Sequence, residues 1–184
     1  MKHCGTQTIE TERLILRRLR REDAAAMFRN WTSDPEVTKY LTWPTHESVA
    51  VTEQILDLWM KNYENDWFYQ WGIELRSAGE VIGSISVVGM EEEIDAAAIG
   101  YCIGRNWWHQ GITSEALAAV IQYLFREVGC SRIEARHDVR NPHSGGVMQK
   151  CGMRFEGVLR SADRNNQGIC DIAQFAILKS DLGL

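Results

Sequence analysis

The sequence predicts one α/β domain built around a mixed sheet. Two observations support this class. Strand-like and helix-like segments alternate along the chain, as they do when helices cover a sheet. The 184 residues also contain no internal repeat, low-complexity tract or Pro/Ser-rich linker where a second domain would begin. With 45% hydrophobic and 24% charged residues the composition is that of a globular chain, and about 70% of the unfolded surface can be buried at this length.

The first half of the chain is expected to contain a strand, two helices and a β-hairpin. Residues 13–19 form the strand, because leucines alternate around a β-branched residue. The first helix is capped by Asp23 and ends before Pro35, with a buried stripe of Ala24, Met27, Phe28 and Trp31. The second helix follows Pro44 and buries Val51, Ile55, Leu58, Trp59 and Asn62. Residues 68–75 and 81–88 pair across a glycine-containing loop.

The second half continues the alternation. Residues 96–103 form an apolar strand that leads into a helix with Leu117, Val120, Ile121, Leu124 and Phe125 on its buried side. A strand over 132–139 and a short helix over 141–151 follow, and Gly152 is a suitable residue to end that helix. The last two strands are expected over 153–159 and 169–178.

Charge and cysteine usage exclude several classes of function. Lys plus Arg number 20 against 25 Asp plus Glu, so the net charge of −5 disfavours a nucleic-acid partner. No apolar run reaches the ~18 residues of a membrane span, and the start of the chain lacks the apolar core of a signal peptide, so we expect a cytoplasmic protein. The five cysteines, at 4, 102, 130, 151 and 170, have no metal-binding spacing and are expected to be free thiols; no metal site is predicted.

The most informative segment is the junction between the strand over 96–103 and the following helix. The first amides of a helix have no internal partners, so they can bind an anion such as a pyrophosphate. Gly111 lets the backbone approach such a ligand. The segment is neither a P-loop nor a GxGxxG turn. The alternative is an ordinary strand-to-helix turn capped by Ser114.

The string WWHQGITSEAL at 107–117 resembles the acetyl-CoA-binding motif of the GNAT superfamily of N-acetyltransferases, specifically its RimJ/RimL-like branch. Four other segments agree in order: ETERLILRRLRREDA, SAGEVIGSISV, RNPHSGGVMQKCGMRFEGVLR and QGICDIAQFAILKSD. The resemblance implies a single α+β domain over residues 10–181, with residues 1–9 as an N-terminal extension. Its sheet would be mixed, seven-stranded, mostly antiparallel and centrally splayed, with helices on both faces.

The resemblance also implies roles for individual residues. Main-chain groups of Cys102 and Ile103 would face the pantetheine arm of acetyl-CoA, and Asn141 would bind the same arm. Backbone amides around the pyrophosphate would come from His109, Gln110, Gly111, Ile112, Thr113 and Ser114. Ser144, one helical turn after Asn141, would place its hydroxyl near the CoA sulfur. Acetyl-CoA would be the cosubstrate, without a metal.

Two positions depart from the broad family pattern. Trp108 and Thr113 replace the usual first and last motif residues, and Trp108 is typical of the RimJ/RimL-like branch. Thr113 requires more backbone clearance or adds a hydroxyl to the phosphate site. Met148 lies where other branches can place a tyrosine, which leaves Ser144 as the expected partner of the departing thiolate.

The resemblance points to Asp163 as the proton acceptor, although a turn aspartate without a catalytic role explains this residue equally well. Glu74, Glu93 and His137 are the other candidates. Nothing near Cys102 in sequence lowers its pKa, so we expect an apolar filler and direct acetyl transfer, without an acetyl-cysteine.

The amine chemistry favours an N-terminal acceptor. At pH 7 an α-amine with a pKa near 8 is roughly one-tenth neutral, whereas a lysine is neutral about once in 2,500 molecules. The predicted function is therefore acetyl-CoA-dependent acetylation of the α-amine of a peptide or ribosomal protein. The alternatives are a small-molecule amine (a polyamine or an amino-sugar) and a non-catalytic CoA-binding sensor. The acceptor site is expected near Pro44 and Glu93, and Trp67 and Trp71 are expected at a homodimer face.

Overall fold

An eight-stranded sheet in the order β1-β2-β3-β4-β5-β6-β8-β7 runs through the computed structural model, which describes residues 1–184. Its strands are β1 (Ile9–Glu10), β2 (Leu14–Arg17), β3 (Gln70–Leu75), β4 (Glu80–Glu91), β5 (Ala96–Ile103), β6 (Arg132–Asp138), β7 (Arg154–Asn165) and β8 (Gly168–Leu178). Only the β5–β6 pair is parallel. The predicted class is confirmed, with one strand more than expected. The additional strand, β1, is too short to show any alternation and exists through its pairing with β2.

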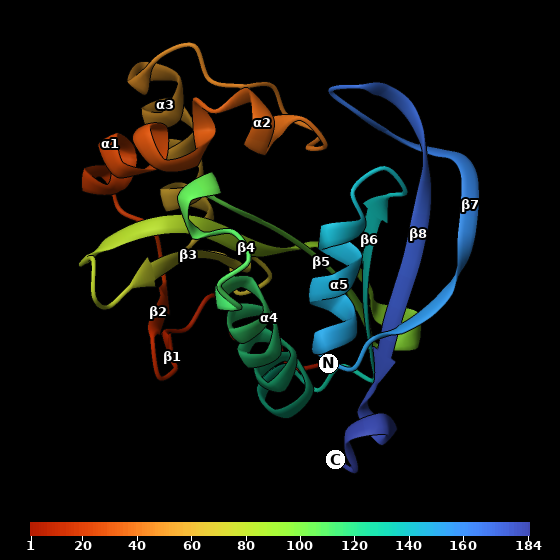
Figure 1. The fold of residues 1–184 in the computed structure, drawn as a ribbon. Helices are drawn as coiled ribbons and strands as arrows, with labels where there is room; N and C mark the ends of the chain where they lie inside the picture. Colours follow the sequence, from red (N-terminus) through yellow and green to blue (C-terminus); the bar gives the residue numbers. More distant parts are fainter.

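Helices cover both faces of the sheet, as predicted (Figure 1). One side carries α1 (Ala24–Met27), α2 (Pro35–Thr38) and α3 (Val49–Asn62), and the other carries α4 (Ile112–Tyr123) and α5 (Pro142–Lys150). The π-helical turns Phe28–Thr32 and Leu124–Val128 continue α1 and α4, and short 3-10 turns are formed by Arg21–Asp23, Glu92–Ile94, Arg105–Trp107 and Lys179–Leu182. The structure has no helix with the length and apolarity needed to cross a membrane.

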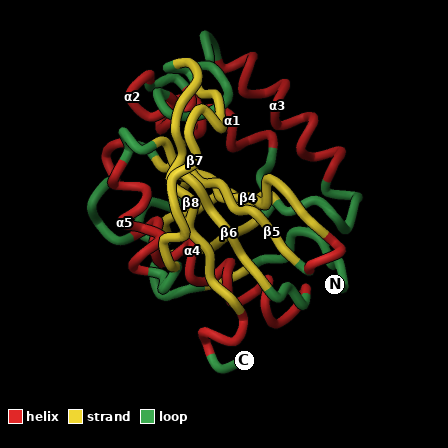
Figure 2. Tube along the Cα trace, turned by 90° about the vertical axis from the view of Figure 1, so that its right-hand side faces the viewer, coloured by secondary structure: helices red, strands yellow, loops and turns green.

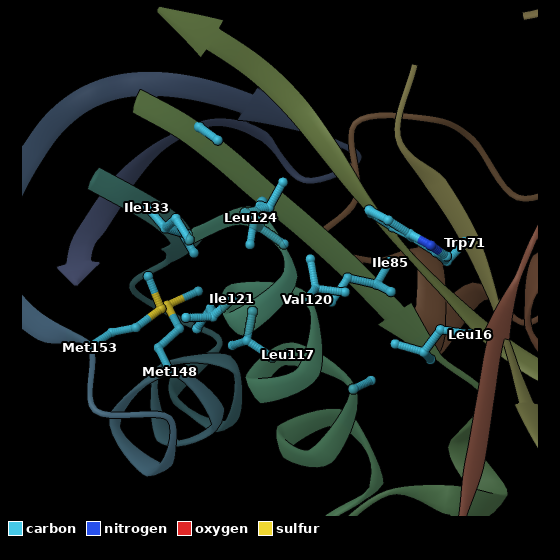
Figure 3. Packing of buried hydrophobic residues seen from close by; sticks show 14 of the residues in the cluster. Leu16, Trp71, Ile85, Leu117, Val120, Ile121, Leu124, Ile133, Met148 and Met153 are labelled. Atoms are coloured by element: carbon cyan, nitrogen blue, oxygen red, sulfur yellow. The ribbon is translucent and has the colours of Figure 1, made fainter. Parts of the chain in front are cut away.

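The larger hydrophobic core lies between the sheet and α4. The predicted stripe of this helix is confirmed, since Leu117, Val120, Ile121, Leu124 and Phe125 are all fully buried. Figure 3 shows four of these side chains, Leu117, Val120, Ile121 and Leu124, against the strand residues Leu16, Trp71, Ile85 and Ile133, with Met148 and Met153 at the α5 end. Because this core holds the start of α4 against β5, it fixes the junction that the sequence singled out.

A smaller core lies under α1 and α3 and corrects one prediction. The buried positions of α3 are Thr52 and Leu56, whereas Leu58 is 53% exposed. Thr52 can be buried because its hydroxyl is hydrogen-bonded to Thr32 at 3.1 Å and to His46 at 2.7 Å. The spacing of apolar residues does not reveal such a satisfied polar residue, so Thr52 was not expected on the buried face. Ile55 and Trp59 of the predicted stripe do line the cavity, and Leu58 is the member that faces solvent.

The predicted dimer face is wrong for one of its two tryptophans. Trp71 is fully buried in the larger core and donates its indole N–H to the Gln7 carbonyl at 2.7 Å. Trp67 is exposed and stacks on His3, with ring centroids 4.0 Å apart. The two residues therefore form no common surface. All five cysteines are free thiols.

Strands β5 and β6 separate after a short paired region. They pair only at Ala96–Ala98 with Arg132–Glu134. Beyond that region, main-chain groups on one side of β5 lack a neighbouring strand. The Gly104 N–H donates to the Ile82 carbonyl of β4 at 2.8 Å, and strand alternation then turns the main-chain groups of Tyr101 and Ile103 toward the opening. Those of Cys102 point toward β4, which corrects the expectation that Cys102 offers them to a ligand.

The β7–β8 hairpin reaches across this opening toward the α2 region (Figures 1 and 2). Its turn is tied down by Asn166, whose backbone N–H donates to the Leu41 carbonyl at 3.1 Å. The Asn166 side-chain amide donates to the carbonyls of Thr38 and Trp43, at 2.8 and 2.7 Å. Residues far apart in the sequence are thereby joined over one end of the splay.

Candidate functional site

A cavity of about 950 Å³ occupies the splay between β5 and β6 and continues under α1, α2 and α3. The predicted binding and catalytic residues Cys102, Ile103, His109, Gly111, Ile112, Thr113, Ser114, Asn141, Ser144 and Asp163 all line it. Gln110 does not. Its side chain instead donates to the Asn106 carbonyl at 2.9 Å, within the loop itself. The structure thus gathers almost the whole predicted set around one space.

The start of α4 at this cavity has no side-chain cap. Gly111 is the N-cap residue, with φ of 74°, and no side chain accepts a capping hydrogen bond from the amides of the first turn. The first helical bond runs from the Glu115 N–H to the Gly111 carbonyl at 3.1 Å, so the preceding amides lack helical partners. Ser114 lies inside the first turn and does not cap the helix, which corrects the alternative interpretation of this turn.

Arg13 fixes the outer side of the same loop. Its guanidinium donates to the Gln110 carbonyl at 2.9 Å and to the Glu115 carboxylate at 2.6 Å. Burial on its own would raise the pKa of Glu115, but hydrogen bonds from Thr11 and Arg13 outweigh that effect and lower it. The negative charge in the first turn is therefore compensated by Arg13, and the helix N-terminus remains suited to an anion.

A phenol and a hydroxyl meet where β5 faces α5. Tyr101 donates its hydroxyl hydrogen to the Ser144 carbonyl at 2.9 Å and lies 3.1 Å from the Ser144 hydroxyl. Burial raises the pKa of Tyr101 far above its usual range, so the phenol remains a donor at neutral pH. A tyrosine was expected only on α5, where Met148 is instead buried in the core, so this phenol could not be predicted from the α5 sequence. The strand supplies the phenol instead.

Asn141 and two histidines lie at the α5 edge of the cavity. Asn141 is the N-cap residue of α5, but its side chain makes no capping hydrogen bond and lines the cavity. His143 meets His109 edge to face, with ring centroids 4.8 Å apart, so the loop before α4 touches the first turn of α5. His109 has a φ of 61°, which is uncommon for a residue with a side chain.

The four candidates for the proton acceptor separate clearly in the structure. Asp163 lines the cavity, with one oxygen 3.0 Å from Arg136 Nε and the other accepting the Arg164 N–H at 2.7 Å. His137 also lines the cavity, and its Nδ1 is paired with the Asp138 carbonyl at 2.8 Å. Glu74 is bound by Arg17 at 2.5 Å, and neither Glu74 nor Glu93 lines the cavity. Both glutamates are therefore excluded.

The end of the cavity under α2 and α3 is walled by aromatic side chains, including Trp31, Trp43, Trp59 and His46. His46 is hydrogen-bonded through Nδ1 to Thr52, and burial lowers its pKa. Pro44 and Glu93, around which an acceptor site was expected, do not line the cavity, although the neighbours Trp43 and His46 do.

Cys102 lies between the two ends of the cavity. Its thiol is 3.5 Å from the Ser84 hydroxyl, and burial raises its pKa. A buried thiol of this kind is a poor nucleophile. This environment favours a packing role for Cys102 over a role as a nucleophile.

Comparison with known proteins agrees with this geometry. The profile of the acetyltransferase (GNAT) domain matches residues 13–154. The chain belongs to the GNAT acetyltransferases. It is 33% identical to the uncharacterized N-acetyltransferase p20 of Bacillus licheniformis, over 95% of this chain and 98% of that protein. It is thus an acyltransferase enzyme of the N-acetyltransferase type.

Two further matches are consistent with the RimJ/RimL-like branch. The GNAT chain is 33% identical to the ribosomal-protein-serine acetyltransferase of Escherichia coli (strain K12), over 53% of this chain and 54% of that protein. Mycobacterium smegmatis RimJ, in complex with a CoA-disulfide, shares its fold with a TM-score of 0.88 at 24% identity, covering 100% of this chain and 93% of that one. GNAT acetyltransferases use acetyl-CoA as the acetyl donor.

Proposed function

We propose that this protein transfers the acetyl group of acetyl-CoA to the N-terminal α-amine of a peptide or ribosomal protein. The observation that carries the proposal is the uncapped start of α4, which directs unpaired amides into the cavity. A diphosphate at Gly111–Ser114 would satisfy those amides and the positive end of the helix dipole. Gly111 supplies the left-handed turn, and Thr113 adds a hydroxyl at the cavity wall.

The pantetheine arm fits the open edge of β5. Its amides need partners of both kinds, and the main-chain groups of Tyr101 and Ile103 face the opening. The Ile103 carbonyl already accepts the Trp108 indole N–H at 2.9 Å, which leaves the Ile103 N–H and the main-chain groups of Tyr101 for the arm. On the opposite wall, the side-chain amide of Asn141 makes no capping hydrogen bond and is therefore available as a partner for the pantetheine arm.

The bound cosubstrate supplies an activated thioester, and the remaining tasks belong to this chain. The Ser144 hydroxyl lies on the α5 wall and would donate a hydrogen bond to the departing sulfur. Tyr101, whose own hydrogen is directed to the Ser144 carbonyl, holds Ser144 in position. Asp163 would hold the incoming amine and receive its proton. Because Arg136 and the Arg164 N–H already occupy its oxygens, its help as a base is modest. Transfer is direct, since the Cys102 thiol stays protonated.

A modest base suits an α-amine. Such an amine is roughly one-tenth neutral at pH 7, so deprotonating it costs only about 1 kcal/mol, against about 5 kcal/mol for a lysine. The β7–β8 turn also restricts access sterically, because Asn166 holds it over one end of the gap between β5 and β6. A flexible chain end passes such a cover more readily than a lysine on a folded surface. The name of the Escherichia coli relative, a ribosomal-protein-serine acetyltransferase, supports a ribosomal protein as the acceptor.

The test combines binding with turnover. Isothermal titration measures the affinity for acetyl-CoA and CoA, and thiol release is then followed with peptides, a Nα-blocked lysine peptide, a polyamine and an amino-sugar. We expect acetylation of free N-termini above all others. Preferred turnover of the polyamine or the amino-sugar would replace the proposed acceptor by a small molecule. Binding of acetyl-CoA without turnover of any amine would favour a CoA sensor and contradict the proposal.

A further inference from the structure

One buried polar group in the cavity has no partner in the protein. Gln70, at the start of β3, is 6% exposed, and its side-chain Nε2 makes no hydrogen bond. Its main chain is fully engaged, because its N–H donates to Thr6 Oγ1 at 2.9 Å and its carbonyl accepts the Tyr63 hydroxyl at 2.8 Å. Buried donors almost always have partners, and an unpaired one destabilises the fold. The free amide therefore requires an explanation.

The Gln70 side chain lies on the sheet face that carries α1 and α3. Neighbouring side chains of a strand alternate between faces, and Trp71 enters the larger core beside α4. A Cβ built on Gly72 would meet Leu19 of the smaller core, which identifies the opposite face. Gln70 shares that face with Gly72 and lines the cavity beneath Trp59 and Ile55 of α3.

A second polar side chain lies next to this amide. Ser86 of β4 is the direct cross-strand partner of Gln70 and lines the same cavity. The adjacent pair, Tyr69 and Val87, is hydrogen-bonded through the Val87 N–H at 3.0 Å, so Gln70 and Ser86 form a pair without main-chain hydrogen bonds. Side chains approach most closely in such pairs. The Gln70 amide and the Ser86 hydroxyl thus form a small polar patch on the sheet surface of the cavity, at the end that is walled by aromatic side chains.

We propose that Gln70 and Ser86 form a subsite for a neutral polar group of the amine acceptor, remote from the reacting nitrogen. The inference rests on the proposed function and extends it to specificity. Gln70 lies two strands away from β5, which is about 10 Å at the usual strand spacing. An extended peptide rises about 3.3 Å per residue, so the recognised side chain belongs to its second or third residue.

The hydrogen-bonding groups of Gln70 and Ser86 determine which ligand group can bind. Gln70 Nε2 needs a hydrogen-bond acceptor, and a hydroxyl such as that of Ser86 both donates and accepts. A carboxamide or a hydroxyl satisfies both members. An ammonium group would leave the Gln70 donor unpaired, and a carboxylate would lose its hydration without gaining a cationic partner. An apolar side chain would also leave the donor unpaired.

The experiment compares peptides that share a free N-terminus and differ at one position. Asn is compared with Leu, and Thr with Val, at residues two and three; amines with hydroxyl-ended and methyl-ended tails extend the panel. We expect wild-type kcat/KM to favour the polar member by about tenfold, which is the value of about one hydrogen bond. Gln70→Leu and Ser86→Ala should remove most of this preference while the Kd for acetyl-CoA stays unchanged. Gln54→Leu, on the exposed side of α3, is the matched control.

A second readout does not depend on turnover. Because Gln70→Leu removes an unpaired buried donor, we expect the Tm of the free protein to stay the same or rise. A clear fall in Tm would show that the amide has a structural role and overturn the subsite. An equal loss of kcat/KM on polar and apolar acceptors would also overturn it. A wild-type enzyme that acetylates no amine contradicts the proposed function, which is a separate result from either of these.

Discussion

The hydroxyl oxygens of Tyr101 and Ser144 lie 3.1 Å apart, although the two residues are 43 positions apart in the sequence. The contact joins β5 to α5 across the wall of the cavity. It restores a phenol at the position where the sequence of α5 had suggested none. The hydrogen of the phenol is directed to the Ser144 carbonyl at 2.9 Å, so Tyr101 also fixes the first turn of α5.

Replacing Tyr101 by Phe tests this arrangement. Tyr101→Phe should lower kcat by about tenfold, because Ser144, the expected donor to the departing sulfur, loses the hydrogen bond that positions it. The free energy of unfolding should fall by about 1 kcal/mol, since one buried hydrogen bond is removed. The Kd for acetyl-CoA should change little. Steady-state kinetics, calorimetry and urea unfolding measure these quantities, and an unchanged kcat would remove Tyr101 from the reaction.

Asn141→Ala should weaken binding of acetyl-CoA by about tenfold, which is the value of one well-formed hydrogen bond. The Asn141 side chain does not cap α5, so the fold should lose little stability. Isothermal titration gives the Kd, and thermal unfolding checks the fold. Asn62→Ala, at the end of α3 and outside the cavity, is the control. Equal affinity in the Asn141 variant and the wild type would contradict the assigned role.

Local pattern was enough for most elements, and the family resemblance supplied the predicted residues that line the cavity. The strand over 96–103 was predicted from its apolar run and has these bounds in the structure. Contacts between distant segments were beyond the reach of sequence periodicity. Tyr101 has its role only because α5 packs across β5, and Trp71 is buried only because its strand lies in the middle of the sheet. The unpaired amide of Gln70 likewise becomes visible only once every neighbour is in place.

Gly111→Ala tests the turn that opens α4. With φ of 74° this position places an alanine in the left-handed region, at a cost of about 1–2 kcal/mol. The added Cβ would meet only Arg13, at 3.7 Å, so the cost is conformational and not a clash. We expect weaker binding of acetyl-CoA as the turn shifts. Gly129→Ala is a matched control, because Gly129 has φ of 85° and open space around it.

The two glycine variants should lose similar stability in urea unfolding. Only Gly111→Ala should raise the Kd for acetyl-CoA, because Gly129 lies at the opposite end of the α4 segment. A similar rise in Kd for both variants would indicate a general loosening of the fold. It would then contradict a specific role of the Gly111 turn in binding.

Asp163→Asn should mainly lower kcat and leave the Kd for acetyl-CoA near that of the wild type. The amide keeps the size of the side chain but no longer attracts or accepts a proton from the amine. Asp181→Asn is the control, because Asp181 pairs with Arg154 outside the cavity. If Asp163→Asn lost acetyl-CoA binding to the same extent as Asn141→Ala, Asp163 would belong to the donor site and not to the acceptor side.

Asp138 should give stability a dependence on acidic pH. Hydrogen bonds from Arg140 hold the pKa of this carboxyl well below its usual range against the opposing effect of burial. Its carboxylate also accepts the Asn165 amide at 2.8 Å, which ties β6 to the β7–β8 hairpin. A pKa lowered by folding means that the stabilisation is complete above the unfolded-state pKa near 3.9 and is lost as the pH falls below it.

Asp138→Asn should therefore reduce the free energy of unfolding at pH 7 by about 1–3 kcal/mol, the range for hydrogen bonds to a charged group. The difference from the wild type should shrink between about pH 5 and pH 3, because the wild-type carboxylate loses its advantage there. Urea unfolding across this range measures it, with Asp181→Asn as a more exposed ion pair for comparison. A difference that stays constant down to pH 3 would show that the charge of Asp138 contributes nothing, and that its shape alone fastens the hairpin over the cavity.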